Sequence, residues 1–113
     1  MEAFEKLDVW KRSSRLCSEI YKSLVSCRDF GFKDQLIRSA LSVPSNIAEG
    51  YERNSKKEYV RFLKIAKGSC GELRTQLYIA KDVGLVQDPP AGDFLAEAIE
   101  LSKMLQGIIN RLK

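Results

Sequence analysis

The sequence predicts an all-α protein, an antiparallel up-and-down four-helix bundle that forms a single domain over residues 1–113. Apolar residues recur at intervals of three and four along most of the chain, and no segment alternates with period two for long enough to indicate a strand. Turn-forming residues interrupt this spacing in three places, which leaves four helices. A chain of 113 residues can bury about two-thirds of its unfolded surface in one core.

The first predicted helix ends at a break over residues 28–31, where a polar pair and Gly31 interrupt the apolar spacing. Its apolar positions are Trp10, Cys17, Ile20, Tyr21, Leu24 and Val25. Intervals of three and four place these side chains along one side of a helix. We therefore expect this stripe to face the core.

The second predicted helix has a wide apolar face. Its central stripe consists of Leu36, Ala40, Val43, Ile47 and Tyr51. Further apolar residues widen the stripe to an arc of about 160°, namely Ile37, Leu41, Pro44 and Ala48. One bundle core usually needs less, so we expect a second subunit to cover the surplus.

Pro44 lies in the interior of that second helix. Because proline has no N–H, Pro44 cannot donate to the carbonyl of Ala40, and we expect a kink there. The freed carbonyl is then available to Asn46, to Gln76 or to a partner chain. Alternatively, Ser42 caps a new helix that has Pro44 in its first turn.

Glu49 and Arg53 follow on the polar side of the same helix. Glu49 precedes Arg53 by four residues, which is the favourable order for an ion pair within a helix. We expect Asn46 and Glu49 to organise the bundle or its interface rather than to bind a ligand.

Two further breaks bound the third helix. The first break is Gly50–Asn54, and Ser55 with Glu58 then forms a capping box, in which each side chain accepts from the other's backbone N–H. The second break spans residues 84–92, where a glycine ends the third helix and Asp88-Pro89-Pro90 supplies a cap and a proline start for the fourth.

The third and fourth helices carry long apolar stripes. The third, of about 30 residues and about 45 Å, is marked by Tyr59, Phe62, Leu63, Ala66, Cys70, Leu73, Leu77 and Ala80. The fourth is marked by Phe94, Leu95, Ala98, Leu101, Leu105, Ile108, Ile109 and Leu112.

Residue types argue against catalysis, a metal or a cofactor. The chain has no histidine, which the di-iron helix bundles and most zinc sites require. The three cysteines are odd in number and form no Cys-x-x-Cys pair, which favours a reducing cytoplasm. Gly68 and Gly71 lie inside a predicted helix rather than in a phosphate-binding loop. No apolar stretch approaches the roughly 20 residues that span a membrane.

Positive charge concentrates on one segment. Residues 53–82 carry eight cations and three anions, an excess of five, whereas the whole chain has a net charge of +4. We therefore predict a nucleic-acid-binding face formed by Arg53, Lys57, Arg61, Lys64, Lys67, Arg74 and Lys81, with Tyr78 as a stacking surface. The alternative is a solvated helix face.

Several blocks of the chain resemble a known protein family. They are Leu7–Trp10, Arg38–Ala40, Ser42–Gly50, Arg53, Ser55, Glu58, Phe62-Leu63, Ile65-Ala66, Gly68-Ser69, Glu72-Leu73 and Thr75–Leu77. They resemble the four-helix-bundle proteins encoded in intervening sequences of bacterial 23S ribosomal RNA genes, and the resemblance extends over nearly all of the chain up to Gly84. The shared motif residues, to which we assign a structural or interface role, are Arg38, Pro44, Asn46, Glu49, Gly50, Glu72 and Gln76.

The resemblance implies an antiparallel four-helix bundle that assembles as a homopentameric ring. Distant relatives are accessory proteins of diversity-generating retroelements, in which a similar pentamer binds a reverse transcriptase and nucleic acid. No reaction is known for the family proper. The sequence therefore predicts a non-enzymatic, self-associating scaffold that engages structured RNA, DNA or a nucleic-acid enzyme. The alternative is a scaffold that binds only proteins.

Overall fold

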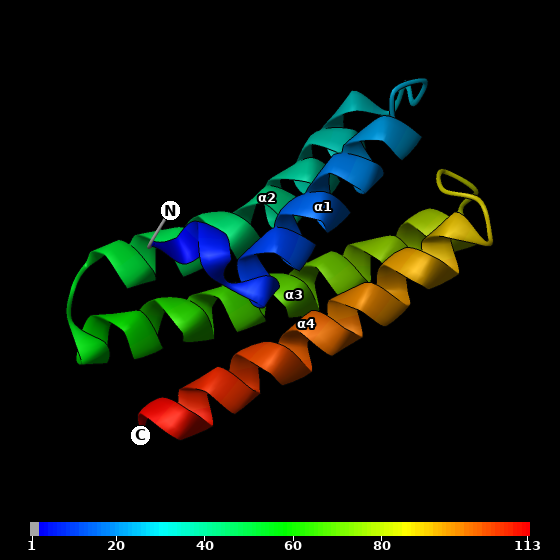
Figure 1. Cartoon of the computed structure of the whole chain (residues 1–113). Coiled ribbons are helices and arrows are strands. Elements are labelled where there is room, and N and C mark those ends of the chain that lie inside the picture. Colours follow the sequence, from blue (N-terminus) through cyan, green and yellow to red (C-terminus); the bar gives the residue numbers. More distant parts are fainter. Residues whose placement is uncertain (1–2) are drawn as a thin grey trace.

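The computed structural model describes residues 3–113, which form a short 3-10 helix followed by four α-helices (Figure 1). The elements are η1 (Phe4–Lys6), α1 (Asp8–Ser23), α2 (Phe30–Glu52), α3 (Lys56–Asp82) and α4 (Pro90–Leu112). The described residues contain no strand. The predicted four-helix, all-α architecture is confirmed.

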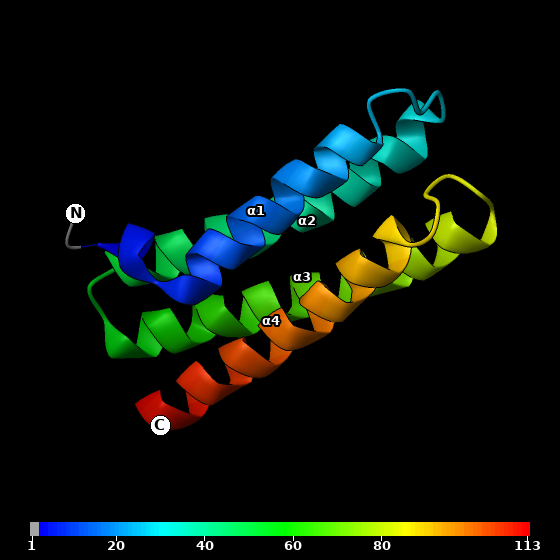
Figure 2. The same ribbon diagram turned by 45° about the vertical axis from the view of Figure 1, so that its right-hand side comes forward.

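Successive helices run in opposite directions along a bundle of 42 × 23 × 21 Å. The two hairpins, α1 with α2 and α3 with α4, lie against each other, so that α1 and α4 share one side of the bundle (Figures 1 and 2). α2 packs most extensively against α3, and α1 packs least against α4. α3 is the most extensively packed of the four helices, because its contacts with α2 and with α4 are the two largest in the bundle.

All four helices contribute to one apolar core. Its largest fully buried side chains include Ile20, Leu36, Ile47, Leu63, Leu73, Leu77, Leu101 and Leu105. Burying each such side chain contributes about 1.5–3 kcal/mol relative to leaving it in water. The apolar intervals read from the sequence thus identify most of this core.

The stripe predicted for α1 omits Val9 and Leu16, which are buried, and it is wrong at two of its own positions. Ile20 and Leu24 are buried, but Tyr21 is 57% exposed and Val25 is 71% exposed. Val25 lies beyond the last residue of α1, Ser23, so the helical spacing no longer sets its direction. Tyr21 lies at the edge of the buried stripe, where the bundle leaves α1 open to solvent.

α2 runs as one helix through Pro44, which is buried. A new helix capped by Ser42 is therefore excluded. Asn46 donates from Nδ2 to the carbonyl oxygen of Ser42 at 2.8 Å and to its Oγ at 2.9 Å. Of the partners suggested for the Ala40 carbonyl, Asn46 is therefore wrong, because its amide bonds to the residue one helical turn before it.

The sequence predicts that α2 ends at Gly50, and this prediction is wrong. Gly50 is buried inside the helix, which continues to Glu52. A Cβ atom at Gly50 would lie 2.6 Å from the Cβ of Phe62 on α3, so glycine here permits close approach of the two helices. The chain turns at residues 53–55, where Asn54 has a φ of 54°, a left-handed conformation that asparagine tolerates.

The predicted helix caps are present, with one exception. Ser55 Oγ accepts from the backbone N–H of Glu58 at 3.2 Å. Asp88 lies one residue before Pro89, the N-cap of α4, and its Oδ1 accepts from the backbone N–H of Gly92 at 3.0 Å. Gly84 follows α3 with a φ of 81°. The capping box is half formed, because the Glu58 carboxylate accepts hydrogen bonds from Arg61 rather than from Ser55.

Part of the wide apolar face of α2 remains uncovered. Ile37 and Ala48 are partly buried, whereas Leu41 is 54% exposed. Tyr51, assigned to the central stripe, is 37% exposed and packs edge to face on Tyr59 of α3, with ring centroids 5.7 Å apart. Exposed apolar area of this kind is typical of a surface that contacts another protein.

We predict that Gly50→Ala destabilises the protein by about 1–3 kcal/mol, because the new methyl group overpacks against Phe62. Urea unfolding followed by circular dichroism measures this loss. Gly71→Ala is the matched control, since nothing lies within 4 Å of a Cβ at Gly71. That change should stabilise the helix by about 0.5–1 kcal/mol. Equal effects of the two substitutions would contradict the close contact.

Candidate nucleic-acid interface

α3 separates its apolar residues from most of the predicted cationic ones. Its buried side comprises Phe62, Leu63, Ala66, Ser69, Cys70, Leu73, Leu77 and Ala80. Lys57 and Lys64 are exposed and form no ion pair with any of residues 3–113. They are seven residues apart, which places them about 10.5 Å apart along the same side of the helix. This pair therefore presents positive charge to solvent outside any ion pair, although the charge of Lys57 also acts on the neighbouring Glu58 carboxylate.

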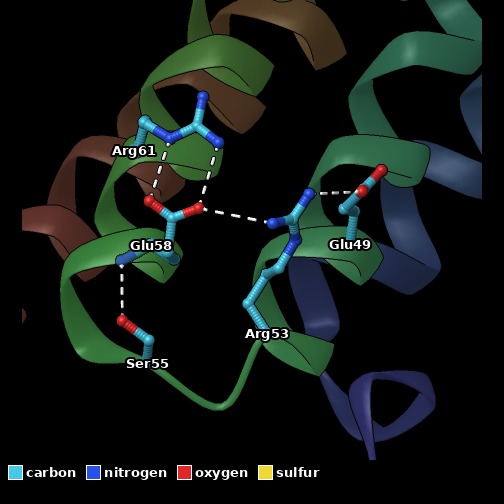
Figure 3. A network of polar contacts seen from close by, with 5 residues as sticks. All are labelled: Glu49, Arg53, Ser55, Glu58 and Arg61. Carbon is cyan, nitrogen blue, oxygen red and sulfur yellow. Dashed lines mark hydrogen bonds and ion pairs between the residues drawn. The ribbon is translucent and has the colours of Figure 1, made fainter.

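Arg53 and Arg61 converge on one carboxylate at the junction of α2 and α3 (Figure 3). Arg61 donates to Glu58 from Nε at 3.1 Å and from Nη2 at 3.0 Å. Arg53 Nη1 lies 3.6 Å from Glu58 Oε1, and Arg53 Nη2 lies 3.0 Å from Glu49 Oε2. The predicted ion pair between Glu49 and Arg53 is confirmed. Two anions thus balance the two cations.

The same two arginines also form cation–π contacts with the ring of Phe62. The Cζ atom of Arg53 lies 4.9 Å from the ring centroid, and that of Arg61 lies 4.4 Å from it. Such cation–π contacts contribute about 0.5–1 kcal/mol at exposed sites. Because Phe62 is buried, it restrains both guanidinium groups near the surface of the bundle.

Hydrogen bonds from Arg61, together with its charge and that of Arg53, lower the pKa of the Glu58 carboxyl below its ordinary value of 4.5. A lowered folded-state pKa means that the ionised carboxylate stabilises the folded protein above the unfolded-state pKa. This contribution is lost as the pH falls through the folded-state pKa. The network is therefore intact at neutral pH.

The remaining predicted cations differ in whether an acidic side chain neutralises their charge. Lys67 donates to the neutral Gln106 Oε1 at 2.7 Å, so its charge is not cancelled. Lys81 pairs with Asp88 at 3.0 Å, and this hydrogen bond lowers the pKa of Asp88. Arg74 is partly buried, and its Nε has no hydrogen-bond partner within the described part of the chain.

Tyr78 has the exposure that a stacking surface requires. Its side chain is 52% exposed on α3, four residues after Arg74 and therefore on the same side of the helix. Lys57, Lys64 and Tyr78 are thus exposed and Lys67 is partly exposed, whereas Arg53, Arg61 and Lys81 already have acidic partners.

Some of the shared motif residues lie in a row of polar contacts between α2 and α3, which we call the polar seam, and others lie at the surface. Asn46 donates to Ser42 Oγ, which lies 2.8 Å from Ser69 Oγ of α3. In a separate contact between the same two helices, Ser39 Oγ donates to Glu72 Oε1 at 3.1 Å. Gln76 Oε1 is buried without a hydrogen-bond partner among the described residues. Arg38 is exposed.

Sequence reasoning missed the serines of this seam. Ser39 is 2% exposed and Ser69 is 9% exposed, although serine is usually a surface residue. The available signal was that both are flanked by apolar residues at helical intervals. Buried hydroxyl groups need partners, and facing helices supply them here.

The described residues offer few groups for catalysis. Within residues 3–113, no cluster of three or more His, Cys, Asp or Glu residues is arranged to hold a metal ion. Burial raises the pKa of the Cys70 thiol to about 11 and also raises that of Cys17, which opposes formation of the reactive thiolate. No helix in this part of the chain is both long and apolar enough to traverse a bilayer.

Comparisons with known proteins agree with this architecture. A model of the family described as 23S rRNA-intervening sequence protein matches residues 5–107. The chain is also similar to a crystal structure from Bacteroides thetaiotaomicron, a protein of unknown function from the S23 ribosomal protein family. The two are 25% identical with a TM-score of 0.83, and the match covers 89% of this chain and 97% of that one. No curated protein sequence matches the chain.

We predict that Arg61→Gln raises the pKa of the Glu58 carboxyl toward its ordinary value, because the two shortest hydrogen bonds to that carboxylate are lost. An NMR titration of the glutamate side chains measures the change. Lys64→Gln is the matched control, since Lys64 has no ion-pair partner within residues 3–113. A Glu58 pKa that responds equally to both substitutions would refute the network.

We further predict that Cys70 resists thiol reagents in the folded protein. In a variant with Cys17→Ser and Cys27→Ser, a thiol pKa of about 11 leaves roughly one molecule in a thousand ionised at about pH 8, and the side chain is buried. Ellman's reagent should therefore react only at the rate of unfolding, and rapidly in concentrated urea. A fast reaction without urea would contradict this assignment.

Proposed function

Because the chain belongs to the 23S rRNA-intervening sequence protein family, we propose that it is a non-catalytic, self-associating scaffold that binds structured RNA or DNA through the outer face of α3. The single observation that carries this proposal is the unpaired, exposed pair Lys57 and Lys64 within a segment that has five excess positive charges. Phosphate backbones bind such uncompensated cations and release counterions.

Lys67 and Tyr78 extend this face along α3. The amide partner of Lys67 is neutral and does not cancel the positive charge of the lysine. Tyr78 offers an exposed ring on which a base can stack. α3 is a continuous helix of 27 residues whose buried side packs in the core. Binding should therefore depend on backbone charge and shape rather than on sequence.

Self-association would multiply this charge. The exposed side chains of Tyr21 and Leu41 on α1 and α2 support a contact between subunits. The family resemblance suggests a ring of five, in which the excess charges of five α3 helices act together. A kink at Pro44 is part of this proposal, because it would set the angle at which α2 meets the next subunit. We also propose a cytoplasmic location, since three unpaired thiols suit a reducing compartment.

A second candidate is a scaffold that binds only proteins, including a nucleic-acid enzyme such as a reverse transcriptase. The acidic partners of Arg53, Arg61 and Lys81 favour this candidate, because half-neutralised cations attract phosphate less strongly. The two candidates differ in whether the protein alone binds nucleic acid at low salt.

We predict that Lys57→Glu plus Lys64→Glu weakens binding of a fluorescent hairpin RNA and a DNA duplex by at least about tenfold at about 50 mM salt. Fluorescence anisotropy over a salt series measures the affinity. Lys11→Glu plus Arg28→Glu makes the same change in net charge on exposed residues outside α3 and should weaken binding much less.

Two outcomes would reject the nucleic-acid proposal. One is no binding by the unmodified protein at low salt, and the other is an equal loss with both variants. Light scattering on the same samples tests assembly, since a particle of 12.8 kDa at micromolar concentration would exclude the ring.

A further inference from the structure

The seam between α1 and α4 is open at both ends. One hollow of about 560 Å³ lies near the ends of the two interhelical loops, between Leu16 of α1 and Phe94 of α4. A second, of about 520 Å³, lies toward the N-terminus of α1, between Val9 and Met104. α1 and α4 are the least packed of the neighbouring helices, and they share one side of the bundle (Figure 2).

A single bidentate ion pair joins the two helices between these hollows. Arg12 donates to Glu97 from Nε at 2.8 Å and from Nη2 at 2.6 Å. This contact lowers the pKa of the Glu97 carboxyl. The two hollows lie one after the other along the α1–α4 seam, on either side of this ion pair, and each is lined by apolar residues together with charged ones. We refer to the two hollows together as the α1–α4 groove. From Leu7 to Ser23 the groove extends about 24 Å along α1, which is the length of about 16 helical residues.

The net charge of the groove lining differs between the two helices and changes sign from one end of the groove to the other. At the loop end, α1 presents three cations and one anion, namely Arg12, Arg15, Lys22 and Glu19, whereas α4 presents Asp93 and Glu97. At the other end, α1 presents Asp8, whereas α4 presents Lys103 and Arg111 with Glu100. The net charge of each rim is therefore negative near the N-terminus of its own helix and positive near the C-terminus, as the helix dipoles favour. Because the helices are antiparallel, opposite charges face each other across both ends.

The charge pattern of the groove indicates which class of molecule it would bind. Each hollow is lined by as many cations as anions, so the groove does not attract a polyanion. Arg15, Asp93 and Asp8 form no ion pair with any other described residue, so their charges are available to a ligand. We propose that the α1–α4 groove binds an amphipathic helix of a partner protein, with an apolar stripe on the floor and complementary charges along both edges.

The proposed helix has acidic residues beside Arg15 and basic residues beside Asp93 at the loop end. At the other end it has basic residues beside Asp8 and acidic residues beside Lys103 and Arg111. The rim pattern is unchanged when the groove is turned end for end, so a peptide with exchanged charges cannot recover complementarity by reversing its direction. The proposal does not rest on nucleic-acid binding, because it uses the opposite side of α4 from the contact with Lys67.

The test uses the full-length protein and two labelled helical peptides of about 18 residues with identical leucine stripes. One peptide carries the complementary charge pattern, and in the other every glutamate and lysine is exchanged. We expect the complementary peptide to bind at least about tenfold more tightly in fluorescence anisotropy at low salt. Peptide binding should shift the amide NMR signals of the α1 and α4 residues that line the groove. It should not shift those around Tyr21 and Leu41, which lie outside the groove.

Arg15→Glu plus Asp93→Lys should reverse or abolish the preference between the two peptides. Lys11→Glu plus Asp82→Lys, an equal exchange of charge at exposed positions outside the groove, should preserve it. Equal affinity for both peptides, no binding, or shifts elsewhere on the bundle would overturn the proposal. A change in oligomeric mass caused by Arg15→Glu plus Asp93→Lys would also overturn it, since the occupant would then be a second copy. Lys57→Glu plus Lys64→Glu should leave peptide binding unchanged, which separates this result from the nucleic-acid test.

Discussion

Gly50 of α2 lies so close to Phe62 of α3 that no side chain fits between them, and much of the structure follows from this contact. It sets the distance at which Ser42 meets Ser69 and Ser39 meets Glu72. Those hydrogen bonds satisfy hydroxyl groups that the helices bury, and they define how α2 and α3 are aligned along their length. Since α3 also packs on α4, the alignment extends to the whole bundle.

The same contact arranges charge at the end of the bundle. Phe62 supports the guanidinium groups of Arg53 and Arg61, and Glu58 joins them into one network. These arginines are thereby restrained and largely compensated. Lys57, beside this network, and Lys64 and Lys67, further along α3, form no ion pair within residues 3–113. Positive charge on α3 is therefore divided between cations that stabilise a helix junction and cations without an acidic partner.

α4 separates two surfaces of different character. On the α3 side, Gln106 accepts from Lys67 and donates to Asn110, so this side is polar and positively charged. On the α1 side, Asp93, Glu97 and Glu100 line an open seam with balanced charge. The proposed nucleic-acid face and the proposed helix-binding groove therefore lie on different sides of α4, because the acidic residues of α4 all lie toward α1.

The sequence by itself determined four amphipathic helices, the caps at Ser55 and Asp88, and the ion pair between Glu49 and Arg53. These depend on residues three or four positions apart, and local geometry decides such contacts. Tertiary structure alone decided that Gly50 would permit contact instead of ending a helix, that Ser39 and Ser69 would find partners, and which cations of α3 would stay unpaired. It also decided that α1 and α4 would leave a groove. Each of these depends on residues distant in the sequence, whose separation only the packing of helices establishes.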